Sequence, residues 1–97
     1  MRTTYSPRAA LDLAEIGHYL AERSPTGAAA VEGRIRTMVE LIAQFPASGR
    51  IVHARPDVSV IPLGNYPYRI FYTASGDELI ILHIRHSARK PIDPGEL

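Results

Sequence analysis

Apolar residues recur at helical spacing near the start of the chain. Leu13, Ile16 and Leu20 follow one another at intervals of three and four, which places them on one face of an α-helix. Ser6 is a favourable N-cap and Pro7 suits the first helical position. The pattern therefore predicts a helix over residues 6–22. We expect another helix to approach along a neighbouring stripe of small side chains, which consists of Ala10, Ala14, Gly17 and Ala21.

A second run with helical periodicity begins after a break at residues 23–25. Thr26 is a suitable N-cap for it, and Pro46 and Gly49 are expected to end it. Its apolar stripe consists of Val31, Ile35, Met38, Ile42 and Phe45. Two amphipathic helices joined by so short a break cannot each bury a stripe alone, so we predict an antiparallel helical hairpin.

The second half of the chain changes to the pattern of extended strands. Residues 58–63, 68–73 and 79–86 are rich in β-branched and aromatic side chains, and turn-forming residues such as Gly64 and Gly76 separate them. Three strands with short connections predict an antiparallel meander, to which residues 2–5 add an edge strand. The expected fold is therefore α+β, with an antiparallel helical hairpin covering one face of a three- to four-stranded antiparallel sheet.

Strand alternation assigns side chains to the two faces of this sheet. We expect the helices to cover the face that carries Ile70, Ile80, Leu82 and Ile84. The opposite face then carries the mixed set of Arg69, Phe71, Ile81, His83 and Arg85. The free face is thus partly apolar and partly cationic.

Composition narrows the possible functions. The chain has 97 residues, of which 45% are hydrophobic, so we expect residues 1–97 to form one domain, with residues 90–97 as a loosely held tail. A net charge of +1 gives no overall field that would attract nucleic acid or a membrane surface. Cysteine is absent, which excludes disulfides and thiol chemistry. The N-terminal residues lack the apolar segment that a signal peptide or a membrane anchor would have, so we expect a cytoplasmic protein.

The candidate chemistry lies near the end of the last predicted strand. Arg85, His86, Arg89 and Lys90 form a cationic corner on an otherwise neutral chain, although such residues are also common as solvated surface side chains. His83 and His86 point to opposite faces of an extended strand and cannot close on one metal ion, so no metal site is expected. Nucleotide-binding and hydrolase motifs are absent, so no cofactor is expected.

Four segments of the sequence resemble the RelE/ParE superfamily of bacterial toxins, and more closely its ParE branch. They are TYSPRAALDLAEIGHYLAE, LIAQFPASGR, LGNYPYRIFY and ELIILHIRHSARKP, and together they extend over nearly the whole chain. The resemblance implies a compact α+β toxin of a toxin–antitoxin system. It also implies a cognate antitoxin protein that wraps the toxin in a hetero-oligomer and silences it.

Two mechanisms divide the superfamily. RelE-type toxins cut messenger RNA on the ribosome with sheet-face arginines and a C-terminal acid or base, and Arg69 and Arg85 match the arginine positions. The acid and base positions fall here on Ser87 and Ala88, which cannot exchange protons near neutral pH, and His86 is one place out of register.

ParE-type toxins lack that catalytic set and block DNA gyrase. The resemblance therefore favours a gyrase inhibitor that binds its target through Arg85, His86, Arg89 and Lys90. The alternative is a ribosome-dependent endoribonuclease that uses Arg69, Arg85 and His86. A third possibility is an inactive toxin relative that acts only with its antitoxin at an operator.

Overall fold

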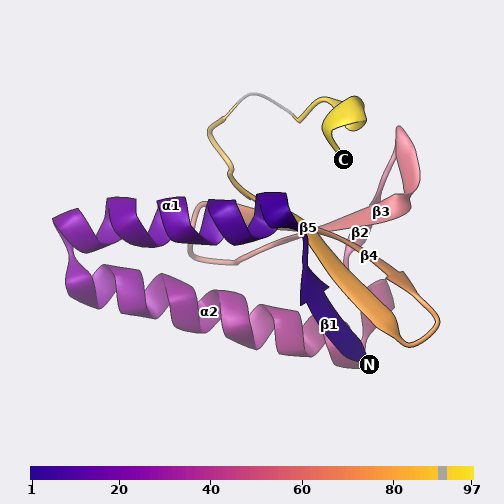
Figure 1. Ribbon diagram of the computed structural model, residues 1–97, viewed down its shortest axis with the longest axis horizontal. Coiled ribbons are helices and arrows are strands. Elements are labelled where there is room, and N and C mark those ends of the chain that lie inside the picture. The colour runs from indigo at the N-terminus through magenta and orange to yellow at the C-terminus, as the bar shows by residue number, and fades with distance from the viewer. Residues whose placement is uncertain (90–91) are drawn as a thin grey trace.

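The structure is a computed structural model that describes residues 1–89 and 92–97. Two long helices run side by side away from a twisted sheet (Figure 1). The C-terminal end of the chain lies on the side of the sheet, away from the outer ends of the helices. The elements are β1 (Arg2–Tyr5), α1 (Pro7–Arg23), α2 (Pro25–Gln44), η1 (Pro46–Ser48), β2 (Arg50–Val52), β3 (Arg55–Pro62), β4 (Tyr68–Ser75), β5 (Glu78–His86) and η2 (Pro94–Glu96). Within the described residues no helix combines the length and the apolar character that crossing a membrane requires.

The helical hairpin forms as predicted, but α2 begins earlier than expected. Ser6 caps α1, because its hydroxyl accepts a hydrogen bond from the Ala9 N–H at 3.0 Å. Ser24, rather than Thr26, caps α2, and its hydroxyl accepts from the Gly27 N–H at 3.0 Å. Pro25 takes the first helical position of α2, so the break between the helices is a single residue.

The contact between the helices uses a different stripe from the one predicted. The small residues Ala10, Ala14, Gly17 and Ala21 are all exposed. Leu13, Ile16 and Leu20 pack against the core instead. Phe45, predicted to continue the apolar stripe of α2, is 59% exposed at the helix end, and Val39 is buried in the stripe. The large side chains therefore carry the packing of the hairpin.

The sheet has five strands in the order β1-β5-β4-β3-β2. The α+β fold class is confirmed, but the prediction of three to four strands, all antiparallel, is wrong in two respects. β1 pairs with β5 in parallel, whereas the other pairs are antiparallel. β2 was not predicted because it has three residues and an outward side chain, Ile51, that is 63% exposed. Such a short edge strand has no hydrophobic alternation that a sequence pattern can reveal.

A β-bulge in β5 corrects the predicted faces of that strand. Phe71 pairs with His83, but the next residue of β4, Tyr72, pairs with Ile81, so Leu82 is an extra residue in the ladder. Before the bulge, Leu79 and Ile81 are fully buried in the core, so the expectation that Ile80 and Leu82 face the helices is wrong.

Beyond the bulge the predicted alternation holds. Ile84 joins the core, and the ladder places Arg69 opposite Arg85 and Phe71 opposite His83. The extra residue therefore changes the face of the first half of β5 only.

Tyr72 fastens the end of α2 to the middle of the sheet. The side chain is 1% exposed, its hydroxyl donates a hydrogen bond to the Pro46 carbonyl at 2.6 Å, and it accepts one from the Gly49 N–H at 2.9 Å. A Cβ atom at position 49 would lie 2.9 Å from the Tyr72 ring, so only glycine fits there without displacement. The link between α2 and β2 is thereby fixed from inside the core.

We expect Tyr72→Phe to lower the free energy of unfolding by about 1–3 kcal/mol, because it leaves one buried N–H and one carbonyl without their partner. Urea denaturation at neutral pH measures the change. Tyr19→Phe is the matched control, since the Tyr19 side chain is 53% exposed and should shift the free energy by less than about 0.5 kcal/mol. Equal losses in both variants would contradict the role assigned to Tyr72.

Candidate functional site

A buried carboxylate lies where α1 crosses β5. Asp12 is only 6% exposed and His83 only 7%. One oxygen, Oδ1, accepts hydrogen bonds from Arg8 Nε and Nη2 at 2.9 and 2.8 Å. The other, Oδ2, accepts from the Ile84 N–H at 3.0 Å and lies 3.1 Å from His83 Nδ1. Because a carboxylate only accepts hydrogen bonds, this geometry places a proton on the Nδ1 atom of His83.

These contacts complete the sheet edge that β1 leaves open. The last pair between β1 and β5 is Tyr5 with Ile81, and the Ser6 N–H still donates to the Ile81 carbonyl at 2.9 Å. Beyond that point the start of α1 supplies the hydrogen-bond partners of β5. The Ser6 hydroxyl donates to the Leu82 carbonyl at 2.8 Å, and Asp12 accepts from the Ile84 N–H. Side chains of α1 therefore replace a neighbouring strand along the end of β5.

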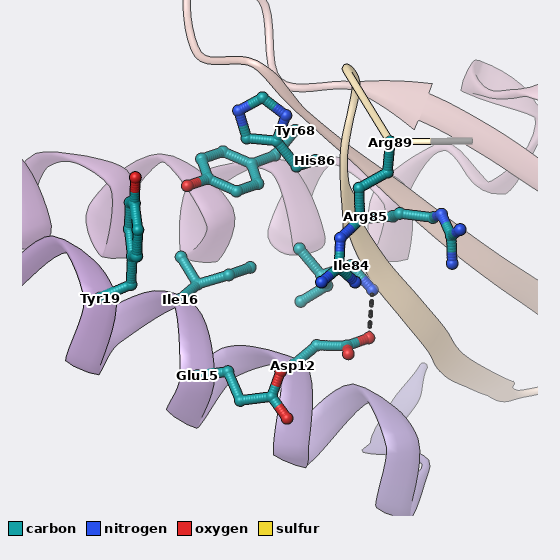
Figure 2. A pocket seen from close by; sticks show the side chains of 9 residues that line it. All are labelled: Asp12, Glu15, Ile16, Tyr19, Tyr68, Ile84, Arg85, His86 and Arg89. Carbon is teal, nitrogen blue, oxygen red and sulfur yellow. Dashed lines mark hydrogen bonds between the residues drawn. The ribbon is translucent and has the colours of Figure 1, made fainter. Parts of the chain in front are cut away.

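A cavity of about 320 Å³ lies between this part of α1 and the end of β5. Figure 2 shows Ile16 and Ile84 facing each other across it, with Asp12 and Glu15 on one side and Arg85 and Arg89 beyond Ile84. Its residues are Asp12, Glu15, Ile16, Tyr19, Tyr68, Ile84, Arg85, His86 and Arg89. The cavity is therefore apolar in the middle and charged at its rim, which is typical of a binding site.

Aromatic side chains form the far end of the cavity. The rings of Tyr68 and His86 meet edge to face, with their centroids 5.2 Å apart. Burial raises the pKa of the Tyr68 phenol, so this hydroxyl is neutral near pH 7 and available as a hydrogen-bond donor. Tyr19 lies opposite on α1, and the Arg23 guanidinium stacks 3.7 Å from the centre of its ring.

The predicted target-binding residues gather at the end of β5. The Arg85 side chain is 19% exposed, and its Nη1 lies 3.9 Å from Glu96 Oε2. The His86 Nδ1 accepts a hydrogen bond from the Ala88 N–H at 3.0 Å, which fixes the orientation of the ring. Arg89 is exposed, and its N–H donates to the His86 carbonyl at 3.2 Å. Lys90 lies outside the described residues.

A smaller cavity of about 130 Å³ lies on the other side of this strand end. The candidate nuclease residues Arg69, Arg85 and His86 all line it. Arg69 and Arg85 are paired neighbours on β4 and β5, so the structure brings two guanidinium groups together on one sheet surface. Within residues 1–89 and 92–97 no three His, Cys, Asp or Glu side chains lie close enough to hold a metal ion.

Sequence patterns pointed to the cations but missed the carboxylate that positions their strand. The sequence pattern predicts a free-face position for His83 and no role for Asp12, but both side chains are buried. One signal was available, since Asp12 lies three residues after Ala9 and four before Ile16, on the buried stripe of α1. A charged residue on such a stripe requires a buried partner.

Comparison with known proteins identifies a common family. The model of the family described as "ParE toxin of type II toxin-antitoxin system, parDE" matches residues 4–91. A protein of Sinorhizobium fredii named putative toxin Y4kP is 37% identical over 86 residues, which is 89% of this chain and 88% of the relative. Toxin RelE2 of Caulobacter vibrioides is 34% identical over 83 residues, which is 84% of this chain and 90% of the relative.

A solved structure shares the fold. It is described as a chromosomal ParDE toxin–antitoxin system from P. aeruginosa, and it superimposes with a TM-score of 0.75 at 27% sequence identity. The similarity extends over 89% of this chain and 95% of the other. The family match over residues 4–91 includes the helical hairpin and the end of β5.

We expect Asp12→Ala to lower the free energy of unfolding by about 2–4 kcal/mol, since it leaves the Ile84 N–H and the His83 ring N–H buried without an acceptor. Urea denaturation checks this, with Glu15→Ala as the control. Glu15 is one turn away on the same helix and its side chain is 54% exposed, so its loss should cost less than about 0.5 kcal/mol. A similar cost for both variants would exclude a special role for Asp12.

Proposed function

Because this chain belongs to the ParE toxin family of type II toxin–antitoxin systems, we propose that it inhibits DNA gyrase by binding and that a cognate antitoxin neutralises it. The protein acts in the cytoplasm and is stored as a hetero-oligomer with the antitoxin. The observation that carries this proposal is the end of β5, where Arg85 and Arg89 border a partly apolar cavity. Such a site suits the recognition of an anionic group beside an apolar one.

The residues Arg85, His86, Arg89 and Lys90 form the target-binding surface of this proposal. Arginine is suited to the role because its planar guanidinium makes two parallel hydrogen bonds to a carboxylate or a phosphate. The contact between α1 and β5 supports this role, since Asp12 accepts a hydrogen bond from the N–H of Ile84, the residue directly before Arg85. The strand that presents the cations is therefore rigid before any target binds, which lowers the entropy lost on binding.

Binding is favoured over catalysis by the surroundings of His86. One nitrogen of its ring already accepts a hydrogen bond from Ala88, and the ring lies against Tyr68. The neighbouring Ser87 and Ala88 do not titrate near pH 7.

One observation favours the second candidate, a ribosome-dependent endoribonuclease. Arg69, Arg85 and His86 line the same small cavity, as a phosphate-binding catalytic group would require.

The antitoxin has a suitable surface between the two helices. A groove of about 310 Å³ lies between α1 and α2, and Leu13, Ile16 and Leu20 of α1 line it together with Val31 and Ile35 of α2. A groove of this shape and composition fits the apolar face of a helix from a partner protein. Arg85, His86 and Arg89 do not line this groove, and Ile16 lines both the groove and the cavity at the end of β5.

The first test separates the two candidate targets in living cells. The chain is expressed from a tightly controlled promoter, and DNA replication and protein synthesis are followed separately by pulse labelling. We expect DNA synthesis to stop first, and purified protein to inhibit supercoiling by gyrase. If protein synthesis stops first and messages are cleaved, the endoribonuclease replaces the gyrase inhibitor. Unimpaired growth would leave the chain as a partner of its antitoxin only.

The second test concerns the arginines. We expect Arg85→Ala and Arg89→Ala each to raise the concentration that half-inhibits gyrase by about tenfold to a hundredfold, because each removes a charge-assisted hydrogen bond worth about 1.5–3 kcal/mol. Arg36→Ala is the control for the change in net charge, since this residue is exposed on α2 and pairs only with Glu32 among the described ion pairs. Folded Arg85 and Arg89 variants that inhibit as well as the control would remove both residues from the site.

A further inference from the structure

The sheet face opposite the helices carries a buried aromatic side chain next to two guanidinium groups. Phe71 is 6% exposed, although it does not belong to the main core cluster beneath the helices. Its neighbours on this face are Arg69 and Arg85, and Arg55 begins the adjacent β3 strand. An aromatic side chain on the uncovered face of a sheet is buried only if another part of the chain lies over it.

Residues 92–97 provide that cover. Ile92 lines the small cavity together with Phe71 and Arg69. The Arg55 guanidinium donates a hydrogen bond to the Pro94 carbonyl at 3.3 Å. Glu96 approaches Arg85 at 3.9 Å. In Figure 1 the C-terminal segment turns back from the end of β5, so that η2 lies in the direction of β3.

The segment presents one of its two acidic side chains to this face. Asp93 is engaged in capping η2, because its carboxylate accepts a hydrogen bond from the Gly95 N–H at 2.9 Å. Glu96 is therefore the acid that meets the cations. The pKa of Arg8 is raised mainly by its hydrogen bond with Asp12, and the negative charge of Glu96 adds to the same effect. Glu96 thus lies within the field of two guanidinium groups.

The segment lies beyond the region that the family comparison covers. The match to the ParE family covers residues 4–91, so the contacts of residues 92–97 lie outside the matched region. They use an aliphatic side chain, a backbone carbonyl and a carboxylate, and all of these are features of an acidic polypeptide. A nucleic acid would offer phosphates but no aliphatic anchor for the space beside Phe71.

We propose that this sheet face is a docking surface for an acidic peptide segment with an aliphatic anchor, and that residues 92–97 occupy it as an intramolecular competitor. The proposal rests on the proposed function only in sharing Arg85. A tethered segment acts at an effective concentration on the order of millimolar, so a partner has to displace it. The ion pair between Arg85 and Glu96 is long, and the Glu96 side chain is largely exposed, so this pair contributes little and the segment is easily displaced.

The test measures peptide binding to the full chain without gyrase. The probe is an acetylated hexapeptide with the sequence of residues 92–97, and the arginine side-chain signals of the ¹⁵N-labelled protein are followed by NMR during the titration. Glu96→Gln weakens the internal competitor and should lower the dissociation constant of the probe by about twofold to fivefold. Glu78→Gln is the matched control, because it makes the same change of charge at the far end of β5, where the residue faces Arg2 at 3.5 Å.

Two further arms test the chemistry of the surface. Arg85→Ala should raise the dissociation constant of the probe by about twofold to fivefold, and a hexapeptide with lysine in place of its glutamate should bind more weakly than the probe. The proposal is overturned if Glu96→Gln binds the probe no better than Glu78→Gln, or if the lysine peptide binds equally well. It is also overturned if a single-stranded DNA hexamer binds more tightly than the acidic peptide at the same salt concentration.

The outcome is separable from that of the gyrase assay. If Glu96→Gln binds the probe more tightly but no form of the protein inhibits gyrase, the proposed function fails and the docking surface remains. If the protein inhibits gyrase and the Glu96→Gln and Glu78→Gln variants bind the probe alike, the docking surface fails and the proposed function remains.

Discussion

The structure depends on how the open edge of β5 is satisfied. β1 pairs with only the first part of this strand, and a buried strand edge without hydrogen-bond partners would cost about 1–3 kcal/mol for each unpaired group. α1 supplies the missing hydrogen-bond partners because it starts directly after β1 ends. Its first turns bring Ser6 and Asp12 to the Leu82 carbonyl and the Ile84 N–H. This junction fixes where α1 starts and where it crosses β5, beside the cavity that Ile16 and Ile84 line.

The bulge at Leu82 determines which side chains of β5 enter the core and which lie on the opposite face of the sheet. By inserting one residue it keeps Leu79 and Ile81 in the core and still directs His83 toward Asp12. The next residues then alternate, so Ile84 enters the core and Arg85 joins the cationic sheet face. The end of β5 consequently lies between two cavities of different character, one rich in tyrosine and one rich in arginine. A regular strand would have placed Arg85 on the same face as Leu79 and Ile81.

Charge on this protein is organised locally rather than globally. The net charge is only +1, yet Arg69, Arg85 and Arg89 gather around the end of β5, and Arg55 contacts the C-terminal segment from the start of β3. Asp57 lies within ion-pair distance of Arg55, and Glu96 lies 3.9 Å from Arg85. Such an arrangement gives a surface that recognises an anionic partner by contact, and it gives little long-range attraction to nucleic acid. It suits the proposed recognition of a protein target.

The sequence alone determined the two helices, the N-cap at Ser6, the three central strands and the pairing of Arg69 with Arg85 on one face. These features follow from periodicity and turn chemistry within a few residues, which a single sequence contains. Only the tertiary structure decided the parallel placement of β1, the short β2, the bulge and the partners of Asp12. The bond between Asp12 and Ile84 joins residues 72 positions apart. Whether such a carboxylate is a solvated surface charge or a buried clamp depends on what the fold brings against it, and no local pattern encodes that contact.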